Sequence, residues 1–196
     1  MTRLCRVFNI VCSVSGLLAL SPLLALIAFA IKWDDAGPVF YWQDRVGRDF
    51  KPFKLDKFRS MTIGADHAGL LTAPADTRVT RCGHFLRRYK LDELPQLWNV
   101  FRGEMQLVGP RPEVGCYVCQ FQDQYAVLLN EPPGITDPAS LAYRREEQLF
   151  TTSEMERQYV SQILPDKLRL SLEYQQRRCL TSDLWILLQT VFNFRL

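Results

Sequence analysis

The hydrophobic pattern divides the chain near residue 32. Residues 7–31 contain no charged side chain, and Arg3 and Arg6 lie just before them. These 25 residues would form a helix of about 37 Å, which exceeds the hydrocarbon core of about 30 Å. A uniformly apolar helix of this length would be unusual inside a small soluble domain. The pattern therefore predicts a membrane helix over residues 1–32.

Two simple arrangements of this helix fit the pattern poorly. Ala28-Phe29-Ala30 has the form of a signal-peptidase site, but the apolar stretch is longer than that of a usual signal peptide. A helix that spans the membrane once conflicts with the positive-inside rule, because basic residues flank it on both sides. After the helix these are Lys32, Arg45, Arg48, Lys51, Lys54, Lys57 and Arg59.

Ser21-Pro22, near the middle of the stretch, suggests a third arrangement. Proline removes a backbone donor, and a neighbouring serine hydroxyl can bond a carbonyl one turn back and favour a bend. A helix broken there could enter one leaflet and return, which would leave both basic flanks on the same side. Because proline is also tolerated in spanning helices, these residues leave the re-entrant helix and a kinked spanning helix both open.

Strands and loops come next in the pattern. Residues 39–43 are rich in strand-forming side chains, and residues 50–58 return with partial alternation after a turn at Gly47, which predicts a β-hairpin. Glycine, proline and aspartate indicate loops over residues 62–77 and 131–138.

Helices are predicted over most of the remaining chain. Helical spacing covers residues 79–89, and a second helix over 92–101 would have Asp92 as its N-cap and Gly103 at its end. The segment 181–196 is apolar but too short to span a membrane, and it fits an interfacial helix or one packed on the core equally well. Further helices are expected at residues 113–130, 153–163 and 165–176.

Composition narrows the function classes. The chain has 196 residues, 47% hydrophobic and 23% charged, with a net charge of +3. Arg3 and Arg6 account for two of these charges, so residues 32–196 carry 22 basic against 21 acidic side chains. Such a nearly neutral body argues against a nucleic-acid partner. The close pair Cys116 and Cys119 lacks a second pair or histidines at ligand spacing, so a zinc site is not predicted.

The candidate chemistry lies between residues 78 and 112. A basic run is followed at once by Asp92-Glu93. Singly, these are ordinary surface and helix-start residues, but arginines clamp polyphosphates and paired carboxylates either hold a divalent cation or supply a nucleophile toward phosphorus. Arg111 lies between Pro110 and Pro112, which restricts its backbone and orients it for a further phosphate contact. The run comprises Arg78, Arg81, Arg87, Arg88 and Lys90.

These residues occur within a recognisable series of motifs. The chain closely resembles the bacterial sugar transferase family of monotopic polyprenyl-phosphate phosphoglycosyl transferases, in its small catalytic form. The resemblance covers nearly the whole chain and is most specific from Gly83 to Pro112. The motifs, in order, are Ser21-Pro22, Lys57-Phe-Arg-Ser-Met61, Leu91-Asp-Glu-Leu-Pro-Gln-Leu-Trp-Asn-Val100, Gly103-Glu-Met105, Val108-Gly-Pro-Arg-Pro112 and Pro133-Gly-Ile-Thr136.

The resemblance implies a reaction and a set of site residues. A sugar 1-phosphate would move from a UDP-sugar to undecaprenyl phosphate, with release of UMP. Asp92 would be the nucleophile that forms a covalent phosphosugar intermediate, and Glu93 its partner; both are also expected to hold Mg²⁺. The phosphate-binding set is expected to comprise Lys57, Arg59, Arg87, Arg88, Pro110, Arg111 and Pro112.

The resemblance also implies an architecture. The fold class expected is α+β and mostly helical, with a re-entrant membrane helix over 1–32 broken at Ser21-Pro22, and a catalytic domain over 33–196 carrying a small β-hairpin and amphipathic interfacial helices. The enzyme would lie on the cytoplasmic face of the bacterial inner membrane. Downstream glycosyltransferases are possible partners in building an exopolysaccharide, O-antigen, capsule or glycoprotein.

One motif departs from the common family pattern. After Thr136 the chain continues as Asp137-Pro-Ala-Ser-Leu141, a loop that is a candidate for donor selection and leaves the sugar undetermined. The alternative function is a catalytically silent membrane scaffold for polysaccharide assembly. A scaffold would be expected to lose a carboxylate of the pair or Arg111, and this chain keeps Asp92, Glu93 and Arg111.

Overall fold

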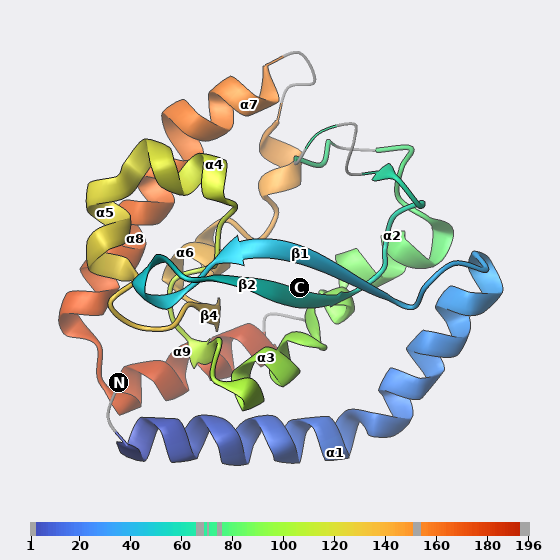
Figure 1. Ribbon diagram of the computed structural model, residues 1–196, viewed down its shortest axis with the longest axis horizontal. Helices are drawn as coiled ribbons and strands as arrows, with labels where there is room; N and C mark the ends of the chain where they lie inside the picture. Colours follow the sequence, from blue (N-terminus) through green and yellow to red (C-terminus); the bar gives the residue numbers. More distant parts are fainter. Residues whose placement is uncertain (1–2, 66–68, 70, 74–75, 151–153, 193–196) are drawn as a thin grey trace.

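The computed structural model describes residues 3–65, 69, 71–73, 76–150 and 154–192. A long N-terminal helix runs along the bottom of the molecule and up one side, and a β-hairpin crosses the centre (Figure 1). Shorter helices surround the hairpin. The predicted α+β, mostly helical class is confirmed. The helices are α1 Arg3–Asp34, α2 Arg81–Arg88, α3 Gln96–Arg102, α4 Gly115–Val118, α5 Gln122–Leu128, α6 Pro138–Ala142, α7 Met155–Gln158, α8 Leu164–Arg177 and α9 Leu180–Phe192.

The strands form two small sheets. β1 (Phe40–Val46) pairs antiparallel with β2 (Pro52–Phe58), as the hairpin prediction requires, and a 3₁₀ turn at Arg48–Phe50 connects them. β3 (Gln106–Val108) pairs in parallel with β4 (Gly134–Thr136). This second pair was not predicted, because three-residue strands carry too little alternation to be distinguished from loops.

Helix α1 is continuous from Arg3 to Asp34 and contains Pro22. It bends near its middle (Figure 1), and Ser21 Oγ donates a hydrogen bond to the Leu18 carbonyl at 2.8 Å. Because proline cannot donate its own backbone bond, this bend follows directly from the sequence. Among the described residues, α1 is the helix long and apolar enough to cross a membrane. Whether it spans or re-enters stays a prediction.

Polar side chains attach the first half of α1 to the rest of the fold. Arg6 donates to the carbonyls of Val100 and Phe101, both at 2.7 Å, at the C-terminal end of α3. Asn9 is buried, and its Oδ1 accepts the Leu107 backbone N–H at 2.8 Å. These bonds add partners to backbone groups at the end of α3 and in β3. Arg6 and Asn9 therefore mark the side of this mostly apolar helix that packs against the rest of the fold.

Three helix predictions need correction. Asp92 does not cap a helix, because it lies in a 3₁₀ turn (Leu91–Glu93) and α3 starts four residues later, at Gln96. Residues 113–130 do not form one helix, since Phe121 leaves helical geometry and separates α4 from α5. Residues 153–163 and 165–176 belong, in the described part, to one run, because a π-helical turn at Tyr159–Ile163 leads into α8 and Pro165 occupies its tolerant first turn.

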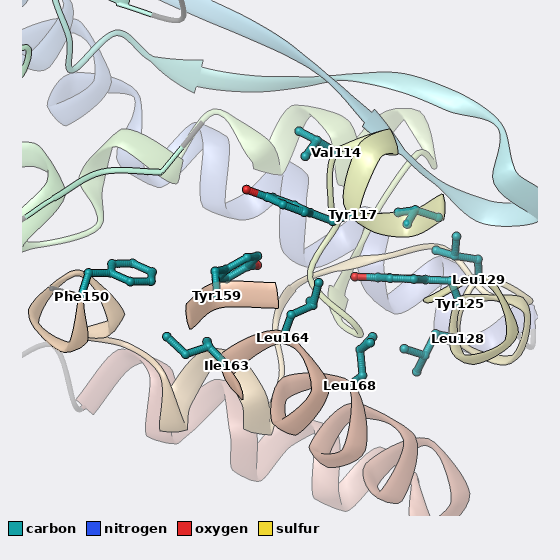
Figure 2. Close-up of a cluster of buried hydrophobic side chains, with 11 residues drawn as sticks. Val114, Tyr117, Tyr125, Leu128, Leu129, Phe150, Tyr159, Ile163, Leu164 and Leu168 are labelled. Carbon is teal, nitrogen blue, oxygen red and sulfur yellow. The ribbon is translucent and has the colours of Figure 1, made fainter. Parts of the chain in front are cut away.

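Apolar side chains from α4, α5 and α8 form the core on one side of the hairpin. Tyr117, Tyr125 and Tyr159 lie in this cluster with leucines from α5 and α8 (Figure 2). On the other side, the fully buried Asn99 of α3 joins the hairpin. Its side chain accepts from the Asp56 N–H at 2.9 Å and donates to the Lys54 carbonyl at 2.7 Å, which fixes α3 against β2.

Gly134 and Gly109 bring two motifs into backbone contact. A Cβ atom on Gly134 would lie 2.1 Å from the Gly109 nitrogen, a distance that real atoms do not adopt. The Gly134 N–H also donates to the Pro110 carbonyl at 2.8 Å. The two glycines therefore decide where the segment that carries Arg111 lies.

We expect Gly134→Ala to lower the free energy of unfolding by about 1–3 kcal/mol, because the methyl group must displace backbone rather than a flexible side chain. Gly115→Ala is the matched control, since its Cβ would meet nothing within 4 Å. The measurement is thermal unfolding of each variant in detergent micelles. Equal transition temperatures for the two variants would contradict the proposed close approach.

Candidate functional site

A cavity of about 390 Å³ opens between the hairpin, the loop that follows it and the segment after β3. The structure brings six of the predicted site residues to its wall. They come from β2 and the residue after it, the end of α2, the 3₁₀ turn at Leu91–Glu93 and the segment between β3 and α4. These residues are Lys57, Arg59, Arg87, Asp92, Glu93 and Arg111.

Asp92 presents an unpaired oxygen at this wall. Its side chain is only 6% exposed, and its Oδ1 has no hydrogen-bond partner within the described structure. Burial, together with the neighbouring Glu93 charge, raises the pKa of the Asp92 carboxyl. A buried carboxylate oxygen without a partner is costly unless a ligand or reaction uses it. Its turn follows Lys90, which holds a left-handed backbone at φ 54°.

The pKa of Glu93 is shifted in the opposite direction from that of Asp92. Arg111 Nη1 donates to Glu93 Oε2 at 3.1 Å, and Nη2 donates to Oε1, so the pair is bidentate. Lys57 Nζ lies 3.9 Å from Oε1. Burial alone would raise the pKa of Glu93, but the Arg111 and Lys57 charges outweigh it and lower the pKa. Two adjacent carboxyls thus differ: Glu93 is charged and fixed, while Asp92 is unpaired.

Lys57 faces the same cavity from β2. Burial lowers the pKa of its ammonium to about 8, against the opposing effect of Glu93. Arg111, by contrast, has its pKa raised by Glu93. The Lys57 ammonium can therefore lose its charge at a pH only slightly above neutral.

The prolines beside Arg111 act through their carbonyls, and neither lines the cavity. Pro110 O accepts the Gly134 N–H, and Pro112 O accepts Arg45 Nη1 at 2.9 Å. These bonds hold the backbone on both sides of Arg111 and so limit where its side chain begins.

Two predicted phosphate-binding arginines behave differently. Arg59 lines the cavity, but its Nη1 and Nη2 donate to Asp35 Oδ2 and Asp35 O at 2.9 and 2.8 Å, which fastens the hairpin to the end of α1. Arg88 is exposed, and its guanidinium lies 5.8 Å from the Tyr89 ring centroid, away from the cavity lining. Consecutive residues of a helix point about 100° apart, so Arg87 and Arg88 of α2 face in different directions.

A second charged cluster was missed by the sequence reasoning. Glu113 accepts from Arg45 Nη1 at 3.0 Å and from the Tyr159 hydroxyl at 2.7 Å, and Lys167 Nζ lies 3.9 Å away. Lys167 also donates to Glu146 at 3.0 Å. Arg45, Glu113, Tyr159 and Glu146 line the same cavity as Asp92 and Glu93. Sequence gives no signal for this cluster, because its members are separated by up to 122 positions and meet only in the folded chain.

The segment Asp137–Leu141 is not the expected loop, because Asp137 caps helix α6 and the next four residues belong to that helix. Asp137 is buried; it accepts the Ser140 N–H at 2.8 Å, which caps α6, and the Ser171 hydroxyl of α8 at 2.6 Å. Ser140 and Leu141 line a second cavity of about 210 Å³, which shares Glu93 and Arg111 with the first. The departure from the family pattern thus lies next to the Glu93–Arg111 pair.

The next question is which residues of this cavity could hold a divalent cation. Among the described residues, no three His, Cys, Asp or Glu side chains cluster as a metal cage. Mg²⁺ needs only one or two carboxylates when substrate phosphates and water complete its shell. Asp92 Oδ1 fits this role, whereas both oxygens of Glu93 already accept from Arg111. Cys116 and Cys119 are exposed free thiols.

Comparison with known proteins assigns the chain to a family. The model of the bacterial sugar transferase family matches residues 1–195. The chain is 40% identical over 194 residues to "undecaprenyl-phosphate glucose phosphotransferase" of Komagataeibacter xylinus, covering 95% of this chain and 35% of that protein. It is 38% identical over 192 residues to "UDP-glucose:undecaprenyl-phosphate glucose-1-phosphate transferase" of Escherichia coli, covering 96% and 39%.

A shorter relative matches over most of its own length. The chain is 43% identical over 141 residues to "putative undecaprenyl-phosphate N-acetylgalactosaminyl 1-phosphate transferase" of Bacillus subtilis, covering 71% of this chain and 75% of that protein. The chain spans little more than a third of the two longer relatives. With nearly every residue matched by one family, this chain belongs to the bacterial sugar transferases.

Proposed function

We propose that this protein transfers a sugar 1-phosphate from a UDP-sugar to undecaprenyl phosphate and releases UMP. The observation that carries the proposal is the unpaired, buried Asp92 oxygen in a cavity walled by Lys57, Arg87 and Arg111. Cations around a carboxylate suit a substrate that brings its own negative phosphates. The relatives named above carry out undecaprenyl-phosphate sugar transfer according to their names.

The reaction has two halves. An Asp92 carboxylate oxygen attacks the phosphorus that carries the sugar, the bond from that phosphorus to the bridging oxygen breaks, and UMP leaves with the electron pair. An oxygen of the acceptor phosphate then attacks the same phosphorus, and the bond to Asp92 breaks to restore the carboxylate. Splitting one difficult transfer into two displacements is the usual benefit of a covalent intermediate.

The surrounding side chains have separate roles in this scheme. Lys57 and Arg111 neutralise phosphate charge as it shifts toward the leaving group. Glu93 orients Arg111 through the bidentate pair and so acts as a positioning residue. A bound Mg²⁺, held by Asp92 and the donor phosphates, would supply further charge stabilisation. A silent scaffold would not need this assembly.

Membrane residence follows from α1 and the apolar face beside it. Large apolar side chains are exposed on α1, α3 and α9, among them Phe29, Trp98 and Trp185. Such a face suits contact with lipid rather than water. We place the cavity on the cytoplasmic side of the inner membrane, because nucleotide sugars are cytoplasmic and both flanks of α1 are basic.

We expect Asp92→Asn to abolish both turnover and the intermediate, because an amide of nearly the same shape is a poor nucleophile. Wild-type protein incubated with UDP-sugar and Mg²⁺, without lipid, should gain the mass of one phosphosugar on Asp92, as measured by intact and peptide mass spectrometry. Asp123→Asn, at an exposed position of α5, is the matched control and should keep full activity. A fully active Asp92→Asn enzyme would exclude the covalent scheme.

The Lys57 ammonium gives a pH prediction. Below a pH of about 8 Lys57 is protonated and neutralises donor phosphate; as the pH rises through this value the charge is lost, so kcat/KM for the donor should fall. Lys57→Arg should move this basic limb upward, since arginine stays charged. Lys54→Arg, exposed on the same strand, should not. The prediction is wrong if all three enzymes share one basic limb.

Topology is testable by labelling single cysteines in an otherwise cysteine-free chain. If α1 re-enters, cysteines at positions 2 and 33 should both resist a membrane-impermeant maleimide in intact cells and react after permeabilisation. Labelling of position 2 alone would indicate a spanning helix. Pro22→Ala should relax the bend and shift the pattern toward that of a spanning helix.

A further inference from the structure

An apolar groove of about 530 Å³ lies where α1, the hairpin and α3 meet. Leu17 lines it from the half of α1 before Pro22, and Leu24, Ala25 and Ala28 line it from the half after Pro22. The groove therefore follows the bend of the membrane helix. The alanines leave room that longer side chains would fill, and the volume is in the range of small-molecule sites, about 300–1,000 Å³.

The groove adjoins the cavity that contains Asp92, with part of the hairpin as their shared wall. Phe40 and Phe58 line both of them, and their rings stack with centroids 5.4 Å apart. Lys57, next to Phe58 on β2, faces the cavity beside Asp92 and Glu93. An apolar chain lying in the groove would therefore have its polar end at the shared Phe40–Phe58 wall, next to the cavity that contains Asp92.

The outer part of the groove suits a position at the membrane surface. Trp42 and Trp98 line it and are 55% and 48% exposed, and tryptophan favours the boundary between hydrocarbon and water. The ion pair of Arg102 with Asp56 closes another part of the wall. The second cavity is a weaker candidate for an apolar chain, because Arg144 and Lys167 line it and α1 does not.

We propose that this groove holds the first isoprene units of the polyprenyl acceptor, with its phosphate in the catalytic cavity. The inference rests on the proposed function and adds the binding site of the acceptor chain. The acceptor must keep its chain in an apolar environment while its phosphate reaches Asp92, and the groove lies between the membrane helix and the wall that it shares with that cavity. An ordinary membrane lipid does not react at Asp92, so its binding would not require a groove next to that carboxylate.

Ala25→Trp tests the proposal, because Ala25 lines the groove and is exposed, so an indole there fills the groove without entering the core. Ala19→Trp, also exposed on α1 but outside the groove, is the matched control. We expect Ala25→Trp to raise KM for undecaprenyl phosphate at least tenfold. With geranyl phosphate, whose chain is short, the rise should be less than threefold.

Release of UMP by the wild-type protein is measured in parallel without lipid. If no UMP is released, the proposed function itself is wrong, and this result is obtained before any acceptor is added. Unchanged KM for undecaprenyl phosphate in Ala25→Trp would overturn the acceptor groove. So would an equal loss with both acceptors, or an equal loss in Ala19→Trp, since each would indicate a general effect on α1 or its lipid contacts.

Discussion

The bidentate contact between Arg111 and Glu93 is the interaction on which the site depends. It joins the segment after β3 to the 3₁₀ turn that carries both carboxylates, and it satisfies one of them while leaving the other unpaired. A buried ion pair repays its desolvation only with good geometry. Here the geometry is maintained by backbone contacts of Pro110 and Pro112 and, beneath them, by the approach of Gly134 to Gly109.

Electrostatic differentiation of two neighbouring carboxyls is the functional result. Desolvation acts on both, but the cations lie closer to Glu93, so the pKa of Glu93 falls while that of Asp92 rises. The arrangement concentrates positive charge around an Asp92 oxygen that has no hydrogen-bond donor among the described residues. Under the proposed function, substrate phosphates would pair with the cations that the cavity wall carries in excess of its carboxylates.

Motif reasoning named candidate residues that the fold brings to one cavity, but it could not assign their contacts. These candidates include Asp92, Glu93, Arg111 and Lys57, and the sequence also predicted the hairpin and a bend at Pro22. It could not show which carboxylate Arg111 binds, because that depends on the turn at Lys90 and the strand pairing of β3 with β4. Arg59 was assigned to phosphate for its motif, whereas a long-range contact with Asp35 holds it. Local patterns predict elements, but pairings between distant segments decide the roles of charged side chains.

The hydrogen bonds from Arg6 and Asn9 have a consequence for how the protein can be handled. They supply partners for carbonyls at the end of α3 and for the N–H of Leu107, so a fragment that begins after Asp34 loses the end cap of one helix and a strand contact. It would also expose the apolar surface beneath Ile27 and Ile31 to water. The membrane helix is thus a structural part of the catalytic body rather than a detachable anchor. Truncation to a fragment without α1 therefore removes contacts that stabilise the fold, along with membrane attachment.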